Sequence, residues 1–210
     1  METISKSIMA LLFTAWWMLA PGVLHAQDYE KLQNAFKDSY TLEANGKYSN
    51  AIEALKSVYE EDSYEINLRL GWLTYFAGFF TESSAYYMKA IQLRPVSIEA
   101  RFGYVNPAAA LGNWEQVKNQ YREILKIDPQ NTMANYRMGS IYYGNEDYTT
   151  ALKYFEKVVN LYPFDYDGLI MYAWTNLKLG KFREAEVLFN KVLMNTPDDS
   201  SALEGLSQIK

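Results

Sequence analysis

The sequence lacks cysteine entirely, and its 210 residues include a single histidine, His25. Without thiols the chain can form no disulfide and no lipid attachment at a cysteine. Zinc sites built from cysteine and histidine, and nucleophiles activated by a neighbouring imidazole, need residues that are almost absent here. We therefore expect no catalytic residue of these kinds, no metal site and no cofactor.

Positive charge is also scarce. Lysine and arginine number 20 against 25 acidic residues, which gives a formal net charge of -5, and the basic residues form no block. Nucleic-acid binding requires clustered basic side chains that neutralise phosphates. The composition thus predicts no nucleic-acid partner, and it disfavours electrostatic binding to anionic lipid.

The first 26 residues have the pattern of a secretory signal. Lys6 precedes an apolar run over residues 8–19, and a small residue, Ala26, stands where cleavage is expected. A run of 12 residues is shorter than the roughly 20 that span a bilayer. We predict a cleavable signal peptide over 1–26, with a retained membrane anchor as the alternative.

Cleavage at this place has two consequences. The mature chain, 27–210, would contain neither histidine nor cysteine, because His25 lies inside the signal. It would reach the periplasm or the medium without direct insertion into a membrane.

Carboxylates are the one catalytic side-chain type left in quantity. Glu60, Glu61 and Asp62 form one group, and Asp198 and Asp199 form another, both at expected helix ends. Acids there usually are solvated or cap the next helix. A glycosidase needs two acids that face each other across a cleft, and the spacing suggests none. We expect no enzyme, and keep a hydrolase with a carboxylate pair as the weakest hypothesis.

An internal repeat of 34 residues is the dominant pattern of the sequence. Prolines, aromatic residues and glycines recur at this interval. They are Pro95, Pro129, Pro163 and Pro197; Phe80, Trp114, Tyr148 and Phe182; and Gly78, Gly112 and Gly180, with Glu146 interrupting the last series. Tyr48 and Gly46 precede the first aromatic residue and the first glycine of these series by 32 residues.

Each repeat has the signature of a helix pair. Apolar residues between a glycine and the next proline fall at helical spacing, as in Ala151, Phe155 and Val158. The glycine can end one helix, and the proline marks where the second cannot continue. The pattern predicts an all-α fold.

The fourth repeat carries the clearest family resemblance. Met138-Gly139, Tyr142, Ala151, Phe155 and Pro163 are similar to the apolar-Gly, Tyr, Ala, Phe, Pro series of the tetratricopeptide repeat family. The chain resembles a secreted bacterial member of this family. The resemblance implies a right-handed α-solenoid of about five helix pairs.

The repeat boundaries follow from this register. They are residues 32–63, 64–97, 98–131, 132–165 and 166–199, within a single repeat domain over 27–210. A last helix over about 200–209 would cap the apolar end of the stack. A broken-off sixth repeat is the alternative for that segment.

Two repeats depart from the family pattern. The third has Val105 where a small residue is expected and Pro107 inside its first helix, which we expect to kink that helix. The first is two residues short and lacks the terminal proline, so we expect an irregular junction with the second.

The resemblance also implies where a partner would bind. In such a stack the first helices line the concave face, and an aromatic lining gives a large contact area at low entropy cost. Each of these aromatics has packing between helices as its alternative. The implied partner-binding residues are Phe36, Tyr40, Trp72, Tyr75, Phe102, Asn106, Tyr136, Arg137, Tyr143 and Trp174.

These features favour a non-enzymatic scaffold or adaptor that binds a peptide or partner protein on its concave face in the bacterial periplasm. The alternative is a glycan-binding protein in polysaccharide uptake or envelope assembly, because aromatic rings stack on sugars without any charge. Family members that hold a peptide's terminal carboxylate use several basic residues with asparagine. Only Asn106, Arg69 and Arg137 are available for such a site.

Overall fold

The computed structural model describes residues 26–209, which contain helices and turns but no strand. The predicted signal peptide lies outside these residues, apart from Ala26, where the first helix begins. None of the helices between residues 26 and 209 is long and apolar enough to cross a membrane. The chain divides into two units, which meet in sequence between Val58 and Tyr59.

The first unit contains one helix pair. Helix α1 (Ala26–Ala44) packs against α2 (Tyr48–Lys56), which buries Ala51, Ile52 and Leu55. Helix α2 has 9 residues, whereas the second helices of the later pairs have 14. The pair that lacks the terminal proline is therefore also the one with a short second helix.

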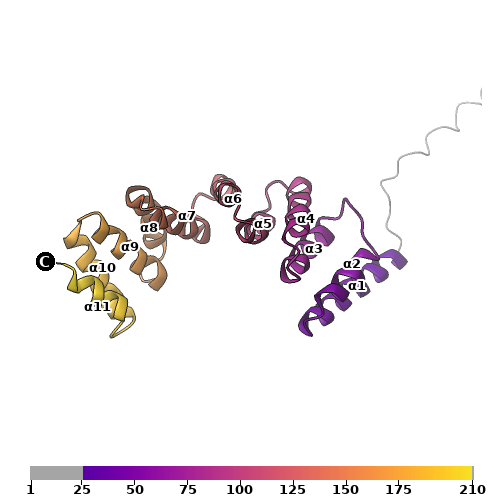
Figure 1. Cartoon of the computed structure of the whole chain (residues 1–210), viewed down its shortest axis with the longest axis horizontal. Helices are drawn as coiled ribbons and strands as arrows, with labels where there is room; N and C mark the ends of the chain where they lie inside the picture. Colours follow the sequence, from indigo (N-terminus) through magenta and orange to yellow (C-terminus); the bar gives the residue numbers. More distant parts are fainter. Residues whose placement is uncertain (1–25, 210) are drawn as a thin grey trace, which may run out of the picture. The chain divides into compact units, whose positions relative to one another are not determined.

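The second unit contains four further pairs and a final helix (Figure 1). Within each pair the two helices pack together, and α11 packs on α9 and α10. This confirms the predicted all-α array of helix pairs with a C-terminal capping helix. The helices are α3 (Tyr64–Phe76), α4 (Phe80–Leu93), α5 (Ile98–Ala110), α6 (Trp114–Ile127), α7 (Thr132–Gly144), α8 (Tyr148–Leu161), α9 (Tyr166–Lys178), α10 (Phe182–Asn195) and α11 (Ser200–Ser207).

The turns inside the pairs share one hydrogen-bonding pattern. After α5, Gly112 has a φ of 74°, and the N–H of Asn113 donates to the carbonyl of Ala108 at 2.8 Å. This is a Schellman motif, in which a left-handed residue closes the end of a helix. The other glycines of the 34-residue series have φ between 70° and 83°.

Glu146 takes the left-handed position where that glycine series is interrupted. Its φ is 62°, and the N–H of Asp147 still donates to the carbonyl of Tyr142 at 3.0 Å. The motif therefore forms with a residue whose Cβ disfavours this conformation. Packing of the pair, and not the turn residue alone, fixes the turn.

Side chains also connect the first helices of the second, third and fourth pairs to the preceding loops. Amide or guanidinium N–H groups of Asn67, Arg101 and Asn135 donate to carbonyls six residues earlier, at 2.8 to 3.1 Å. Two tyrosine hydroxyls reach the cap residue of the next pair: Tyr64 bonds Ser97 at 2.7 Å, and Tyr166 donates to Asp199 at 2.8 Å. Ile98 and Thr132 stand at the equivalent positions of the third and fourth pairs, where Tyr64 and Tyr166 stand in the second and fifth.

The ring of Tyr87 shows how neighbouring pairs pack. A Cβ added at Gly71 would lie 2.9 Å from this ring, and one added at Gly103 would lie 2.1 Å from it. The ring is thus held between α3 and α5 by two positions that admit no side chain. Only 2% of Tyr87 is exposed, and burial raises the pKa of its phenol well above the ordinary value.

The left-handed Glu146 gives a first prediction. Glu146→Gly should raise the free energy of unfolding by about 1 kcal/mol, because glycine removes the steric cost of positive φ. The matched change Gly112→Ala should lower it by a similar amount. Urea denaturation followed by circular dichroism measures both, and equal stability of all three proteins would contradict the account of the turns.

The buried phenol of Tyr87 gives a second prediction. Its folded pKa is raised, so its contribution to stability is complete below the unfolded pKa of about 10 and is lost as the pH rises above it. Tyr87→Phe cannot ionise, so stability of this variant should fall less between about pH 9 and pH 11.5. Urea denaturation across this range tests it. A variant and parent with parallel pH profiles would show that the ring is not sealed.

Candidate functional site

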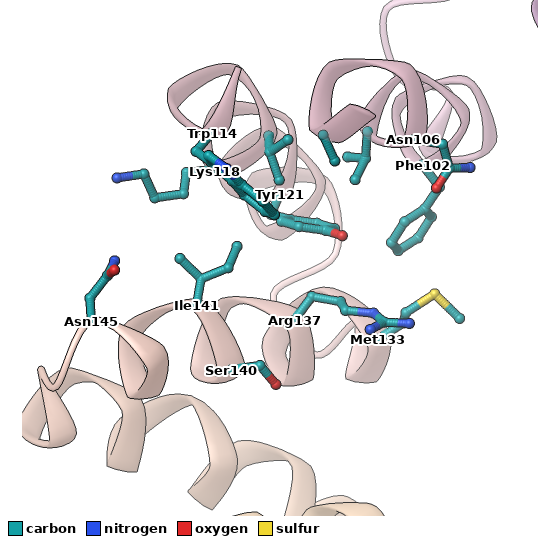
Figure 2. Close-up of a pocket in the computed structure, with 13 residues that line it drawn as sticks. Phe102, Asn106, Trp114, Lys118, Tyr121, Met133, Arg137, Ser140, Ile141 and Asn145 are labelled. Carbon is teal, nitrogen blue, oxygen red and sulfur yellow. The ribbon is translucent and has the colours of Figure 1, made fainter. Parts of the chain in front are cut away.

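A cleft of about 700 Å³ opens among α5, α6 and α7, at the junction of the third and fourth pairs (Figure 2). All three helices contribute to its walls. The lining residues are Phe102, Val105, Asn106 and Ala109 from α5, Trp114, Val117, Lys118 and Tyr121 from α6, and Met133, Arg137, Ser140, Ile141 and Asn145 from α7 and its end.

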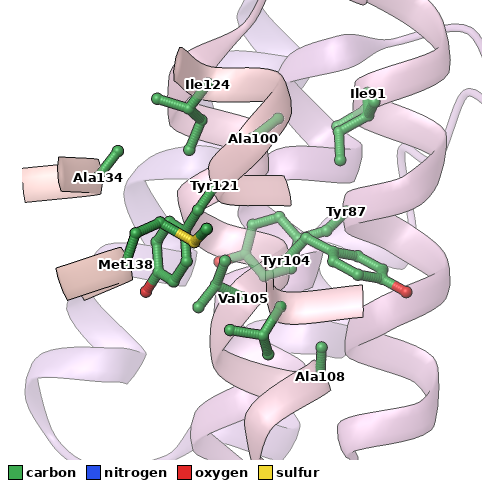
Figure 3. Packing of buried hydrophobic residues seen from close by; sticks show 12 residues of the cluster. Tyr87, Ile91, Ala100, Tyr104, Val105, Ala108, Tyr121, Ile124, Ala134 and Met138 are labelled. Atoms are coloured by element: carbon green, nitrogen blue, oxygen red, sulfur yellow. The ribbon is translucent and has the colours of Figure 1, made fainter. Parts of the chain in front are cut away.

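The floor of the cleft belongs to the hydrophobic core. Val105, Val117 and Tyr121 are at most 7% exposed and are members of the buried cluster that runs from Tyr87 to Met138 (Figure 3). The floor residues are fixed by their packing in this cluster. The geometry of the floor is therefore set before any partner arrives.

The cleft exists because the surroundings of Tyr121 differ from those of Tyr87. Tyr121 lies 34 residues after Tyr87, and the two glycines beside Tyr87 become Val105 and Arg137 at the same interval. Two added side chains keep the first helices from closing over the Tyr121 ring. Accordingly, within residues 59–209, α5 and α6 pack less extensively than the two helices of any other pair. Between successive pairs of this unit, the contact of α6 with α7 is the least extensive.

Exposed apolar side chains stand at the rim. Trp114 is 55% exposed and Met133 58% exposed, and they come from opposite walls of the cleft. Phe102, half-buried, comes from the third wall, α5. An apolar group bound in the cleft would remove this surface from water at a gain of about 25 cal/mol per Å².

The polar groups of the cleft are mostly hydrogen-bond donors. Arg137 is exposed and takes part in no ion pair of the described chain, while its guanidinium lies 6.0 Å from the ring centre of Tyr136. Lys118 pairs with Glu115. None of the lining side chains, all within the described residues, is acidic.

The hydroxyl of Tyr121 has no hydrogen-bond partner within residues 29–209, although the residue is only 6% exposed. Burial raises the pKa of this phenol, and the nearby charge of Arg137 opposes that rise. The hydroxyl is therefore protonated at neutral pH and available as a donor. Figure 2 shows it pointing toward the side of the cleft that carries Arg137.

The structure brings three of the predicted partner-binding residues together in this cleft: Phe102, Asn106 and Arg137. Asn106 and Arg137 are exposed, and Phe102 lies against the Tyr121 ring with centroids 6.2 Å apart. Their shared location makes this the best-defined part of the predicted surface.

Other predicted residues lie against aromatic rings of their own pair. Tyr136 contacts Phe155 with ring centres 5.9 Å apart, and Tyr143 contacts Tyr148 at 5.2 Å. Both predicted residues are half-buried. Their rings serve packing as well as any surface.

Trp174 is also held by its neighbours. Its ring lies 5.3 Å from that of Phe189, and its indole N–H donates to the hydroxyl of Ser201 at 2.8 Å. This tryptophan therefore joins α9 to both α10 and the capping helix.

The remaining predicted residues lie near the N-terminal end of the described chain. Trp72 and Tyr75, on α3, contact Phe76 with ring centres 4.5 and 5.3 Å apart. In the first unit, Phe36 is half-buried and Tyr40 is 57% exposed, both on α1. Their role in binding stays a prediction.

Sequence reasoning missed the contribution of α6. It considered only first helices, whereas Trp114, Lys118 and Tyr121 come from a second helix. One signal was available, because Val105 already marked the third repeat as the one without a small residue. Pro107 marked it too, but α5 continues through this proline to Ala110.

Family models match the C-terminal half of the chain. Residues 142–209 match one model described as tetratricopeptide repeat, and residues 105–166 match a second with the same description. The human Superkiller complex protein 3 is 29% identical over 97 residues. That match covers 46% of this chain, which spans about 6% of the length of the human protein.

Solved structures share the fold over most of the chain. A tetratricopeptide repeat protein from Parabacteroides merdae has a TM-score of 0.73 at 22% identity, over 86% of this chain and 72% of that one. MamA from Desulfovibrio magneticus RS-1 has a TM-score of 0.67 at 18% identity, over 81% and 98%. YrrB, described as having an unusual peptide-binding site, has 0.62 at 19%, over 76% and 79%. These likenesses show an α-solenoid.

Glycines on both sides of the Tyr121 ring should close the cleft. The double change Val105→Gly with Arg137→Gly gives Tyr121 the two glycine neighbours that Tyr87 has. Helices α5 and α7 should then approach the Tyr121 ring and the cleft should shrink, as a crystal structure of the variant compared with the parent would show. An unchanged cleft would mean that some other feature separates the third and fourth pairs.

Proposed function

Because the chain belongs to the tetratricopeptide repeat family, we propose that it is a non-enzymatic scaffold that binds an extended peptide segment of a partner protein. The binding site is the cleft among α5, α6 and α7. This repeat fold supports a protein–protein interaction scaffold, and proteins built from it generally are not enzymes. The cleft is the proposed place of binding, and an extended peptide segment is the proposed partner.

The open cleft with apolar rim side chains carries this proposal. An extended chain presents side chains and backbone groups together, and the cleft offers both apolar walls and polar donors. Asn106 and Asn145 can bond backbone groups of a peptide, while Trp114 and Met133 can cover its apolar side chains. The peptide-binding site named for YrrB is a precedent on the same fold.

The concave surface extends this site. Phe36, Tyr40, Trp72, Tyr75, Tyr136, Tyr143 and Trp174 remain the predicted further contacts along the first helices. Of these, Tyr40 in the first unit and Trp72 in the second are the most exposed.

We place this scaffold in the bacterial periplasm, because residues 1–26 have the pattern of a cleavable signal. N-terminal sequencing of the protein recovered from a periplasmic fraction tests this. A mature start at Gln27 supports it, and an uncleaved N-terminus in the membrane fraction favours the anchor.

A glycan is the second candidate ligand, because the exposed ring of Trp114 at the rim could stack on a sugar face. A glycan array and a displayed peptide library, applied to the same protein, separate the two. Binding to sugars alone would replace the peptide proposal.

Filling the cleft gives the direct test. Ala109→Trp places an indole in the cleft and should weaken binding of library-selected peptides at least about 10-fold, since it occupies the space they need. Ala110→Trp is the matched control: the same change on the adjacent, exposed residue that does not line the cleft. Isothermal titration measures both, and circular dichroism checks folding. Equal affinity in the two variants would move the site elsewhere.

A further inference from the structure

The cleft offers donors and positive charge to a ligand but no negative group. Arg137 lies on one wall without an ion pair in the described chain, and Tyr121 presents an accessible hydroxyl without a hydrogen-bond partner on the same side of the cleft. A guanidinium and a neutral hydroxyl can both donate to the oxygens of one ligand acceptor, and such bonds are stronger when the acceptor is charged. These two donors converge on one region of the cleft.

The surrounding chain makes this region unusual. The protein has a net charge of -5, yet no acidic side chain lines the cleft within the described residues. The Lys118 ammonium is partly neutralised by Glu115, which leaves Arg137 as the uncompensated cation of the lining. A ligand with one negative charge would match this arrangement.

We infer that the cleft selects a peptide segment in which a carboxylate stands next to a bulky apolar side chain. The carboxylate accepts hydrogen bonds from the Arg137 guanidinium and the Tyr121 hydroxyl. The apolar side chain lies against Phe102, Trp114 and Met133. This inference rests on the proposed function, because it names the chemistry of the peptide bound at the same site.

A carboxylate fits better than a phosphate. A phosphorylated side chain carries about -1.5 to -2 charges and three acceptor oxygens at neutral pH. One free guanidinium and one neutral hydroxyl can satisfy a single carboxylate, whereas a phosphate would remain undercompensated in a half-enclosed cleft. The carboxylate is that of an Asp or Glu side chain, because the proposed partner is an extended segment and the cleft holds one uncompensated cation, fewer basic groups than family members use for a terminal carboxylate.

The experiment uses two displayed libraries of random octapeptides against the full chain, one with free C-termini and one with blocked C-termini. Selected peptides are synthesised in matched pairs that differ only in acid against amide, at the side chain or at the terminus. We expect the acid form to bind about 10-fold more tightly than the amide form, because the amide cannot make the charge-assisted hydrogen bonds. Enrichment from the blocked library supports the side-chain carboxylate, and enrichment from the free library alone would overturn it.

Variants then assign this preference to the two donors. Arg137→Gln should reduce the acid-over-amide ratio to less than about 2-fold, and Tyr121→Phe should reduce it by about 3-fold without changing the fold by circular dichroism. Arg122→Gln, an exposed arginine of α6 that does not line the cleft, should leave the ratio unchanged.

The outcomes separate this inference from the proposed function. Peptides that Ala109→Trp excludes but that bind equally well as acid and amide would overturn the carboxylate and leave the peptide site intact. A preference for phosphorylated over carboxylate peptides would also overturn it. If Ala109→Trp excludes no peptide, the proposed function itself fails.

Discussion

The contact between an aromatic ring of a second helix and glycines of the neighbouring helices determines how closely the helices pack. Tyr87 lies against Gly71 and Gly103. Phe189 lies against Gly205 of the capping helix, where an added Cβ would be 2.1 Å from the phenylalanine ring. The backbone of the neighbouring helices can cover both faces of such a ring only if it approaches the ring closely. Where glycine allows this approach, successive pairs pack without a gap.

The cleft lies at the second helix whose aromatic ring has no small residue at either of these positions. Tyr121 has Val105 and Arg137 at the positions where Tyr87 has glycines, so its ring is covered by side chains and not by backbone. The hydroxyl then reaches a cleft instead of the interior of a sealed junction. The same two substitutions therefore make the space and place a cation in it, which links the packing of the solenoid to the chemistry of its candidate site.

Much of the fold could be predicted from the sequence because its determinants are local. The 34-residue interval, the turn glycines and the terminal prolines report on helix ends, and helix ends depend on nearby residues. Glu146 shows the limit of such signals: the turn has the same geometry without the glycine. Packing between the two helices of the pair, α7 and α8, holds the turn, and the turn sequence alone does not show this constraint.

The candidate site was only partly predictable, because it depends on which faces meet. Phe102, Asn106 and Arg137 could be placed on first helices from register alone. Tyr121 reads in the sequence as an ordinary core aromatic, since its equivalents Tyr87, Phe155 and Phe189 are all buried. That its hydroxyl lies in a cleft depends on how α5, α6 and α7 meet, which the repeat pattern alone does not give.

Aromatic residues on the first helices illustrate the same dependence. Tyr136 and Trp174 occupy positions that the family register assigns to the open face, yet each ring lies against a fully buried phenylalanine of the adjacent second helix. A large ring gains more from covering a neighbouring ring than from facing water, as long as its polar atom finds a partner. Trp174 finds one in Ser201, on the capping helix. Tyr121 finds none within the described chain and lines the cleft, so its hydroxyl is the one placed to meet a ligand there.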